Sequence, residues 1–398
     1  MKARKTMVCV ALVTTALLGS TLAAEFAPVV EIPMQKEPLV QIAILLDTSG
    51  SMSGLIDQAR TEMWSLVNEF IFARQQGRQP EVQVALYEYG KSTLSGEVGY
   101  VRRIVPLTTD LDKISEELFA LETNGGDEYC GWVIRDATAG LEWSDSLDDL
   151  KVIFIAGNEP FTQGPVDYRQ ACKAAVEKGI IVNTIHCGSE TDGRNGMWAD
   201  GAALADGRHL NIDQNQQVVH IPAPQDDEIA ALGVRLNQTY VAYGRQGQVA
   251  LMRQRAQDTN AAQASPEASV GRALTKSSSN YSNAHWDLVD AMSNKQVDLS
   301  EVVADDLPEN MRSMTIDERK AFVESKATER AEIQAKIKDL NDQRNKFIAE
   351  QRSQQAEQTD TLGSAAQQAI REQARLKNFT FEAPQSQPTE EGAAPSEN

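Results

Sequence analysis

The sequence predicts an α/β fold, in which a doubly wound, mostly parallel sheet is followed by a mainly helical C-terminal region. Between residues 39 and 221, short apolar runs of strand length alternate with amphipathic segments of helical length. Strands that alternate with helices form parallel sheets covered on both faces. Beyond residue 225 the composition shifts to Gln, Ala, Arg and Glu, with few large apolar side chains, which indicates helices.

The predicted sheet begins with Val40–Leu46, an apolar run that ends at Asp47 and is typical of a strand buried on both faces. From Leu55 onward, apolar residues recur every three or four positions, which predicts a helix with one buried side. Two strand-like runs follow: Glu81–Tyr89, in which apolar residues alternate with others, and the apolar-rich run Val101–Leu107. We expect them to form a hairpin.

Helix and strand continue to alternate in the rest of this half. Helices are expected at 112–122, 131–143 and 166–178, and strands at 151–156, 180–186 and 209–212. In such sheets, ligands bind beyond the carboxyl ends of the strands, where the strand order reverses. Asp47 and the loop Gly157–Glu159 follow two of these strands, so they are candidate site residues.

The C-terminal half is expected to contain helices of two kinds. Residues 225–310 are predicted to be mixed or helical and only partly core-forming, with a linker at 261–283 that is rich in Ala, Ser and Asn. Residues 311–380 are predicted to form a long, coiled-coil-like helical segment, opened by a capping box of Thr315 and Glu318.

A short heptad seam lies within the long helical segment. Its apolar members are Ile333, Ile337, Leu340 and Phe347. Arg344 interrupts the seam, and two heptads are too few to decide between a dimeric coiled coil and packing on the same chain. Residues 383–398 are rich in Pro, Gln, Glu and Ser and are expected to be disordered.

The N-terminal residues have the pattern of a secretory signal peptide. The positive cluster Met1–Lys5 precedes an uncharged, mostly apolar run, and small residues at Ala23 and Ala24 suit cleavage. We expect residues 1–24 to be removed and the mature chain to be exported to a periplasm or outside the cell. The run is at the short limit for a membrane span and no later segment approaches one, so no span is expected in the mature chain.

The charge of the chain argues against nucleic acid as a partner. The formal net charge is −19, and it becomes more negative when Lys2, Arg4 and Lys5 leave with the signal peptide. A strongly acidic surface repels phosphate backbones. The same charge is compatible with solubility and with attraction of cations.

The motif Asp47-Thr48-Ser49-Gly50-Ser51 places one carboxylate and two hydroxyls on a tight turn between a strand and a helix. Such hard oxygens suit Mg²⁺, which takes about six oxygen ligands, several of them from water. A helix cap also explains Asp47 or Ser49, but it does not explain two further polar loops at the same sheet edge. This DxSxS pattern resembles the von Willebrand factor A family, whose metal-ion-dependent adhesion site uses these three residues; the resemblance covers residues 39–221.

The resemblance implies further ligands from two loops. The family's second loop supplies a threonine after a Gly-Gly pair, whereas here Asp127 follows Gly125-Gly126 and is the expected fourth ligand. The third loop usually supplies an aspartate, whereas this chain has Asn158, whose amide oxygen can accept or hold a water. The carboxylate lost at 158 is thus matched by one at 127. Mg²⁺ is the expected ion, with Mn²⁺ and Ca²⁺ as alternatives, and a site altered beyond metal binding is a further alternative.

The resemblance also implies a non-enzymatic protein-binding or adhesion module, in which a partner's Asp or Glu completes the coordination of the cation. Glu128 and Glu159, beside the two loops, are the expected partner-binding residues. The alternative function is an envelope accessory or assembly factor, in which the metal site is structural and the C-terminal helices contact the partner. The sequence indicates neither the partner nor the oligomeric state.

Enzyme functions find little support. Met52 stands where a nucleophile elbow needs serine, and there is no Walker Gly-Lys pair and no HExxH zinc motif. His186 lies next to Cys187, but adjacent strand residues point to opposite faces, so His186 is expected to be structural.

Three cysteines remain after the signal peptide is removed, so at most one internal disulfide forms in an oxidising compartment. Cys130 and Cys187 both lie near the metal face and are the expected pair. Cys172 lies midway along a predicted helix and should sit well below that face.

Overall fold

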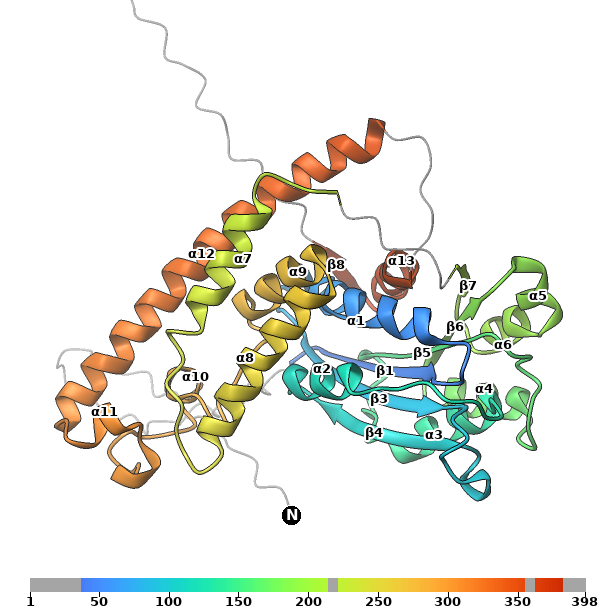
Figure 1. The fold of residues 1–398 in the computed structure, drawn as a ribbon, viewed down its shortest axis with the longest axis horizontal. Coiled ribbons are helices and arrows are strands. Elements are labelled where there is room, and N and C mark those ends of the chain that lie inside the picture. The colour runs from blue at the N-terminus through green and yellow to red at the C-terminus, as the bar shows by residue number, and fades with distance from the viewer. Residues whose placement is uncertain (1–36, 214–220, 355–361, 382–398) are drawn as a thin grey trace, which may run out of the picture. The chain divides into compact units, whose positions relative to one another are not determined.

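A six-stranded sheet forms the centre of the structure, a computed structural model that describes residues 37–213, 221–354 and 362–381 (Figure 1). The strand order is β4-β3-β1-β5-β6-β7. These strands are β1 (Leu39–Asp47), β3 (Glu81–Tyr89), β4 (Val101–Thr108), β5 (Leu150–Gly157), β6 (Ile181–Cys187) and β7 (His209–Ile212). Only the edge strand β4 runs antiparallel to its neighbour in this sheet, which confirms the predicted mostly parallel sheet and hairpin. The predicted signal peptide and C-terminal tail lie outside the described residues.

Helices cover both faces of the sheet (Figure 1). They are α1 (Ser53–Asn68), α2 (Leu111–Phe119), α3 (Cys130–Gly140), α4 (Tyr168–Glu177), α5 (Glu190–Asn195) and α6 (Trp198–Leu204), with a short 3-10 turn η1 (Gly96–Val98). Successive side chains of β1 point to opposite faces: Ile42 and Leu46 enter the core shared with α1, while Ala43 and Leu45 enter the core shared with α3 and α4. The continuous apolar run of β1 therefore reflects burial on both sides.

The C-terminal region is helical, as predicted. Its elements are α7 (Asp226–Leu236), α8 (Gly247–Ala264), α9 (Pro266–Ser277), α10 (Leu288–Ser293), η2 (Ala304–Asp306), α11 (Glu309–Arg312), α12 (Ile316–Gln354) and α13 (Leu362–Leu376). A two-stranded ribbon that the sequence analysis did not anticipate joins β2 (Ala73–Gln75) to β8 (Phe379–Phe381). No helix in the described ranges is long and apolar enough to cross a membrane.

The segment 261–283 is not the linker that its composition suggested, because the end of α8 and all of α9 occupy most of it. Helix α9 packs on α1: Asn68 Nδ2 donates to the carbonyl of Gly271 at 2.9 Å, and a Cβ added at Gly271 would lie 3.1 Å from Trp64 Cβ. Small residues are what such close packing of helices requires. The same composition thus serves a packed helix here rather than a loop.

A buried ionic cluster ties α9 to the sheet domain. The Arg272 guanidinium lies 2.6 Å from Asp112 of α2 and 2.9 Å from Asp258 of α8. Asp258 also pairs with Lys276 at 2.8 Å. The guanidinium lies over the Trp64 ring of α1, 4.6 Å from its centre. Four helices therefore meet at one charged contact, in which Arg272, Asp112 and Lys276 are buried and Asp258 is partly exposed.

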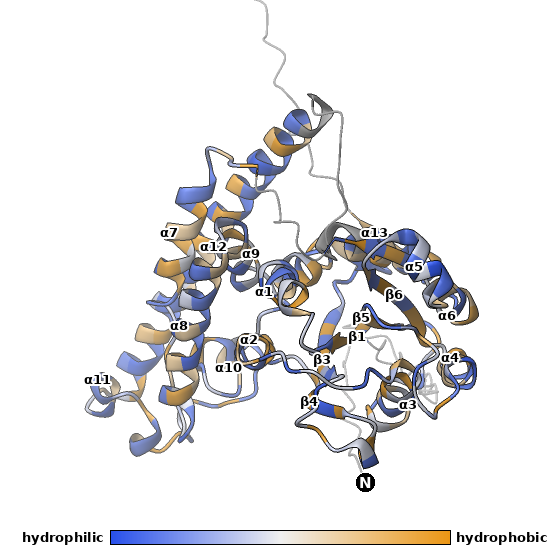
Figure 2. Cartoon of the chain, turned by 45° about the vertical axis from the view of Figure 1, so that its right-hand side comes forward, coloured by the Kyte–Doolittle hydropathy of each residue, from blue (hydrophilic) through white to orange (hydrophobic). Residues whose placement is uncertain are grey.

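The long helix α12 begins with the predicted capping box: Thr315 N donates to Glu318 Oε2 at 2.7 Å, and Glu318 N donates to Thr315 Oγ1 at 3.3 Å. Its seam residues Ile333, Ile337 and Leu340 are buried, and the helix contacts α7 and α9 of its own chain. Arg344, which interrupts the apolar pattern, is buried against Asp226 and Glu267 at 2.7 Å each. In Figure 2 the ribbon of α12 carries many hydrophilic residues with hydrophobic bands between them.

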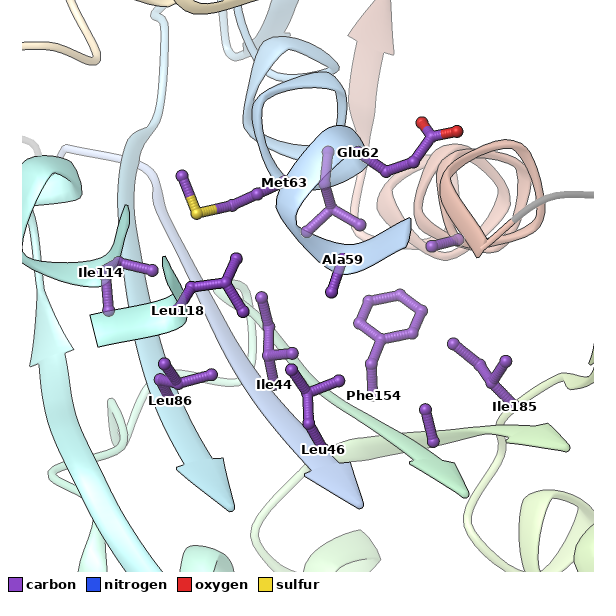
Figure 3. A pocket seen from close by; sticks show the side chains of 13 residues that line it. Ile44, Leu46, Ala59, Glu62, Met63, Leu86, Ile114, Leu118, Phe154 and Ile185 are labelled. Carbon is purple, nitrogen blue, oxygen red and sulfur yellow. The ribbon is translucent and has the colours of Figure 1, made fainter. Parts of the chain in front are cut away.

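Helix α13 covers the sheet beside α1. Gln373 and Asn183 of β6 exchange two buried amide hydrogen bonds, at 2.6 and 3.0 Å. Between α1, α2, α13 and the sheet lies a small apolar cavity of about 40 Å³ (Figure 3). Its lining includes Phe154 and Ala366, whereas the carboxylate of Glu62 is directed away from its centre. Almost all of its lining is apolar, so it offers few hydrogen-bond partners to water.

Candidate metal-binding site

The turn that follows β1 is locked by backbone hydrogen bonds. Asp47 is fully buried, and its Oδ1 accepts from Ser49 N at 2.7 Å. Thr48 N donates to Tyr89 O at 2.8 Å, which fixes the turn to the end of β3. The hydroxyls of Ser49 and Ser51 lie 3.5 Å apart. Helix α1 has no side-chain N-cap, so the turn does not serve as a conventional helix cap.

Asn158 brings the end of β5 to the same point. Its Nδ2 donates to Ser51 Oγ at 3.2 Å. Among the described residues, its Oδ1 and the Oδ2 of Asp47 are buried side-chain oxygens without a hydrogen-bond partner. An unsatisfied buried oxygen costs about 1–3 kcal/mol, and a bound cation would satisfy both. The donor set of carboxylate, hydroxyl and amide oxygens fits a hard ion such as Mg²⁺.

Two glycines shape the walls of this site. A Cβ added at Gly157 would lie 2.5 Å from the Tyr89 hydroxyl and 3.0 Å from Asp47 Oδ2. A Cβ added at Gly90, whose φ is +81°, would lie 2.8 Å from both Asp47 Oδ1 and Glu128 Cγ. Only glycine leaves room at these positions for the two acidic side chains to converge.

The second loop presents Glu128 to the site, and not Asp127. Asp127 is exposed, and its Oδ2 accepts from the Tyr129 hydroxyl at 3.4 Å, which differs from its expected role as fourth ligand. Glu128 is only 7% exposed, so it is not the surface residue expected to contact a partner. Successive side chains along extended backbone point in opposite directions. Gln163 sets the direction, because its Oε1 accepts from Glu128 N at 2.7 Å.

The two buried acids affect each other's ionisation. Burial raises the pKa of Asp47 to about 7; hydrogen bonds from Ser49 lower it, and the charge of Glu159 raises it. Burial, followed by the charges of Asp47 and Glu159, raises the pKa of Glu128 to about 7, whereas a hydrogen bond with the Ser49 side chain lowers it. Nearby like charges and desolvation both disfavour the ionised forms. A cation at this point would favour them.

The described part of the chain contains no group of three or more His, Cys, Asp or Glu side chains that could hold a metal. A cation at this point would therefore depend on the serine hydroxyls and the asparagine amide as much as on carboxylates. Such a donor set resembles a magnesium or calcium site rather than a zinc site.

Residues beneath the third loop hold it in place. His186 is buried, with Nδ1 3.0 Å from Asn211 Oδ1 and Nε2 3.3 Å from the carbonyl of Asn158, a structural role as predicted. Trp198 Nε1 donates to the carbonyl of Glu159 at 2.8 Å. The Trp198 side chain is itself buried, so it packs in the core and also holds the third loop. Glu159 itself is half-buried, so part of its side chain reaches solvent.

The three cysteines Cys130, Cys172 and Cys187 are free and buried, and the expected pair of Cys130 and Cys187 is not formed. Cys187 belongs to the core beneath α1, whereas Cys130 belongs to the core on the opposite face, beneath α3 and α4. Both lie near the carboxyl edge of the sheet, but the sheet itself separates their side chains. A disulfide requires Cβ atoms about 3.5–4.5 Å apart.

No family model matches the chain, and no curated protein matches it. Among solved structures, it is similar to BatB from Bacteroides thetaiotaomicron, with 18% identity over 44% of this chain and 90% of that one and a TM-score of 0.33. It is also similar to the SpRpn10 VWA domain, with 17% identity, 45% and 90% coverage and a TM-score of 0.34. An aerotolerance-related membrane protein from Bacteroides fragilis gives 15% identity, 44% and 92% coverage and a TM-score of 0.30. Residues 39–212 combine a mostly parallel six-stranded sheet, helices on both faces and a DxSxS turn after the first strand, and they have a von Willebrand factor A-like fold.

Proposed function

We propose that this protein is an exported, non-enzymatic protein-interaction module whose von Willebrand factor A-like domain holds a divalent cation, Mg²⁺ first, at the β1–α1 turn. One observation carries the proposal: Asp47 Oδ2 and Asn158 Oδ1 are buried, have no hydrogen-bond partner in the described part of the chain and lie at the same turn as the hydroxyls of Ser49 and Ser51. Buried oxygens without partners are uncommon in folded proteins. A cation is the partner that suits all four groups.

Each residue has a distinct task in this proposal. Asp47 supplies the charge that holds the cation, and its rigid turn keeps the hydroxyls of Ser49 and Ser51 directed to the same point. Asn158 contributes an uncharged oxygen. When bound, the cation supplies positive charge that attracts a partner's Asp or Glu. Because Asn158 replaces a carboxylate of the family pattern, the third loop leaves more of that positive charge available to a partner.

A thermal test compares wild type with Asp47→Ala and Asp47→Asn, each in millimolar Mg²⁺ or Mn²⁺ and in chelator. Ligand binding stabilises the folded state by about 2.7 kcal/mol at a hundredfold excess over the dissociation constant. We expect this increment in wild type and its loss in both variants. Asn158→Asp should enlarge it by adding a carboxylate. The proposal fails if no divalent ion, Ca²⁺ included, changes the wild-type melting temperature and direct titration detects no binding.

A second function is favoured by the surface of α8. Val249 and Met252, three residues apart on this helix, are 56% and 61% exposed. In this alternative the protein is an envelope accessory or assembly factor, the metal site is structural and the helical region binds the partner. Partner binding with and without chelator separates the two: the first function predicts loss of binding in chelator, and the second predicts little change.

A further inference from the structure

Glu128 lies where the chain's own loop reaches the candidate cation site. A Cβ added at Gly90 would lie 2.8 Å from Glu128 Cγ and 2.8 Å from Asp47 Oδ1, so both acidic side chains approach this glycine. Glu128 is only 7% exposed, and the Ser49 side chain of the DxSxS turn is among the groups that lower its pKa. Glu128 is therefore a second acidic group, besides Asp47, close to the DxSxS turn.

The loop that carries Glu128 is held at several places. Asn124 N donates to Thr48 O at 2.9 Å, and Ser92 N donates to Gly125 O at 2.6 Å. Glu128 N donates to Gln163 Oε1 at 2.7 Å. These bonds direct the side chain inward, toward the fully buried Asp47, whose Oδ2 has no hydrogen-bond partner among the described residues.

We propose that Glu128 is an internal competitor at this site: its carboxylate takes the coordination position that a partner's Asp or Glu would otherwise occupy, so a partner binds only by displacing it. The inference rests on the proposed function. A second carboxylate beside Asp47 has two consequences. It strengthens cation binding, and it neutralises the charge that would attract an outside carboxylate. The resting site is thereby closed by the chain itself.

The test uses Mn²⁺ as the probe on the full mature chain and compares wild type with four variants. Glu128→Gln removes the charge at nearly constant size, and Glu128→Asp keeps the charge but withdraws it by one methylene. Asp127→Asn is the matched control, because it removes the neighbouring exposed charge. Asp47→Asn tests the site itself. Mn²⁺ affinity is measured by titration, and the number of waters on the bound ion by water-proton relaxation, before and after addition of acetate.

We expect Glu128→Gln and Glu128→Asp to lower Mn²⁺ affinity by at least about tenfold, as changes around metal sites commonly do, and Asp127→Asn to change it less than about twofold. Both Glu128 variants should show more water on bound Mn²⁺ than wild type, and acetate should displace that water more readily. The proposal is overturned if Glu128→Gln and Asp127→Asn change Mn²⁺ affinity equally, or if the Glu128 variants show the same hydration of bound Mn²⁺ as wild type. In both cases loss of Mn²⁺ binding in Asp47→Asn would still support the metal site itself. Absence of Mn²⁺ binding by wild type overturns this proposal and the proposed function together.

Discussion

Replacement of Arg272 should reveal how strongly the helical region is fastened to the sheet domain. Its guanidinium is 3% exposed, and the Asp112 carboxylate that faces it at 2.6 Å is 4% exposed. Arg272→Ala leaves that carboxylate buried without its cation, which costs about 3–5 kcal/mol. It also removes the contact with the Trp64 ring. We expect the free energy of unfolding to fall by about this amount.

The neighbouring pair of Arg253 and Asp110 provides the matched control. It joins α8 to the N-terminal end of α2 at 3.1 Å, whereas Arg272 joins α9 to α2, and the side chains of Arg253 and Asp110 are 22% and 24% exposed. Solvent screens such a pair, so Arg253→Ala should cost about 0–1 kcal/mol. Denaturation in urea, followed by circular dichroism, measures both values. Equal costs for the two variants, or a cost below about 1 kcal/mol for Arg272→Ala, would refute the argument from burial.

The double variant Arg272→Met with Asp112→Asn separates loss of the ion pair from loss of packing. It removes both charges and keeps most of the volume. Removing both partners of a buried pair is often nearly neutral, whereas removing one is not. The double variant should therefore be more stable than Arg272→Ala. If the double variant is as unstable as Arg272→Ala, the loss of packing around Trp64, and not the loss of charge, accounts for the lower stability.

Three further predictions follow from the site, the ionic cluster and the N-terminus. Gly157→Ala should abolish the rise in melting temperature with Mg²⁺, because the added Cβ meets Asp47 and the Tyr89 hydroxyl. Gly125→Ala should retain this rise, because a Cβ added there has nothing within 4 Å, and the same response of both variants to Mg²⁺ would contradict the geometry. Burial lowers the pKa of Lys276 to about 8, below its ordinary 10.5. Between about pH 8 and 10.5 the unfolded state therefore binds more protons than the folded state, so the free energy of unfolding should rise with pH in this range. If urea titrations give wild type and Lys276→Met the same dependence of stability on pH, this reasoning is contradicted. Mass spectrometry of protein recovered outside the cytosol should give a chain that starts at Ala24 or Glu25, and an intact Met1 would count against export.

The strands and the DxSxS turn could be predicted because their signals are local. The apolar run of β1 and the acid at its end are adjacent in sequence, and the direction of a parallel sheet then places Asp47 and Asn158 at one edge. The sequence near Asp127 and Glu128 does not determine which of the two side chains faces the site. That direction depends on Gln163 and Gly90, which approach the loop from distant parts of the chain.

Other features escaped prediction because one composition suits two structures. Ala, Ser and Gly in 261–283 suit a loop, but they also suit a helix packed closely on Trp64. Cys130 and Cys187 both lie near the carboxyl edge of the sheet. The face of the sheet that each side chain enters, however, depends on where the helices pack. The ribbon of β2 and β8 has strands of three residues each, too short to give any periodic signal.

The ribbon of β2 and β8 limits when this part of the protein can fold during synthesis. Ribosomes synthesise chains from the N-terminus, so β2 emerges long before Phe379–Phe381, its only partner strand among the described residues. Until then, its backbone amides and the sheet surface that α13 later covers stay open to water or to a chaperone. A nascent chain halted before residue 362 would lack both covers. The described fold is therefore complete only after Phe379–Phe381 has been synthesised.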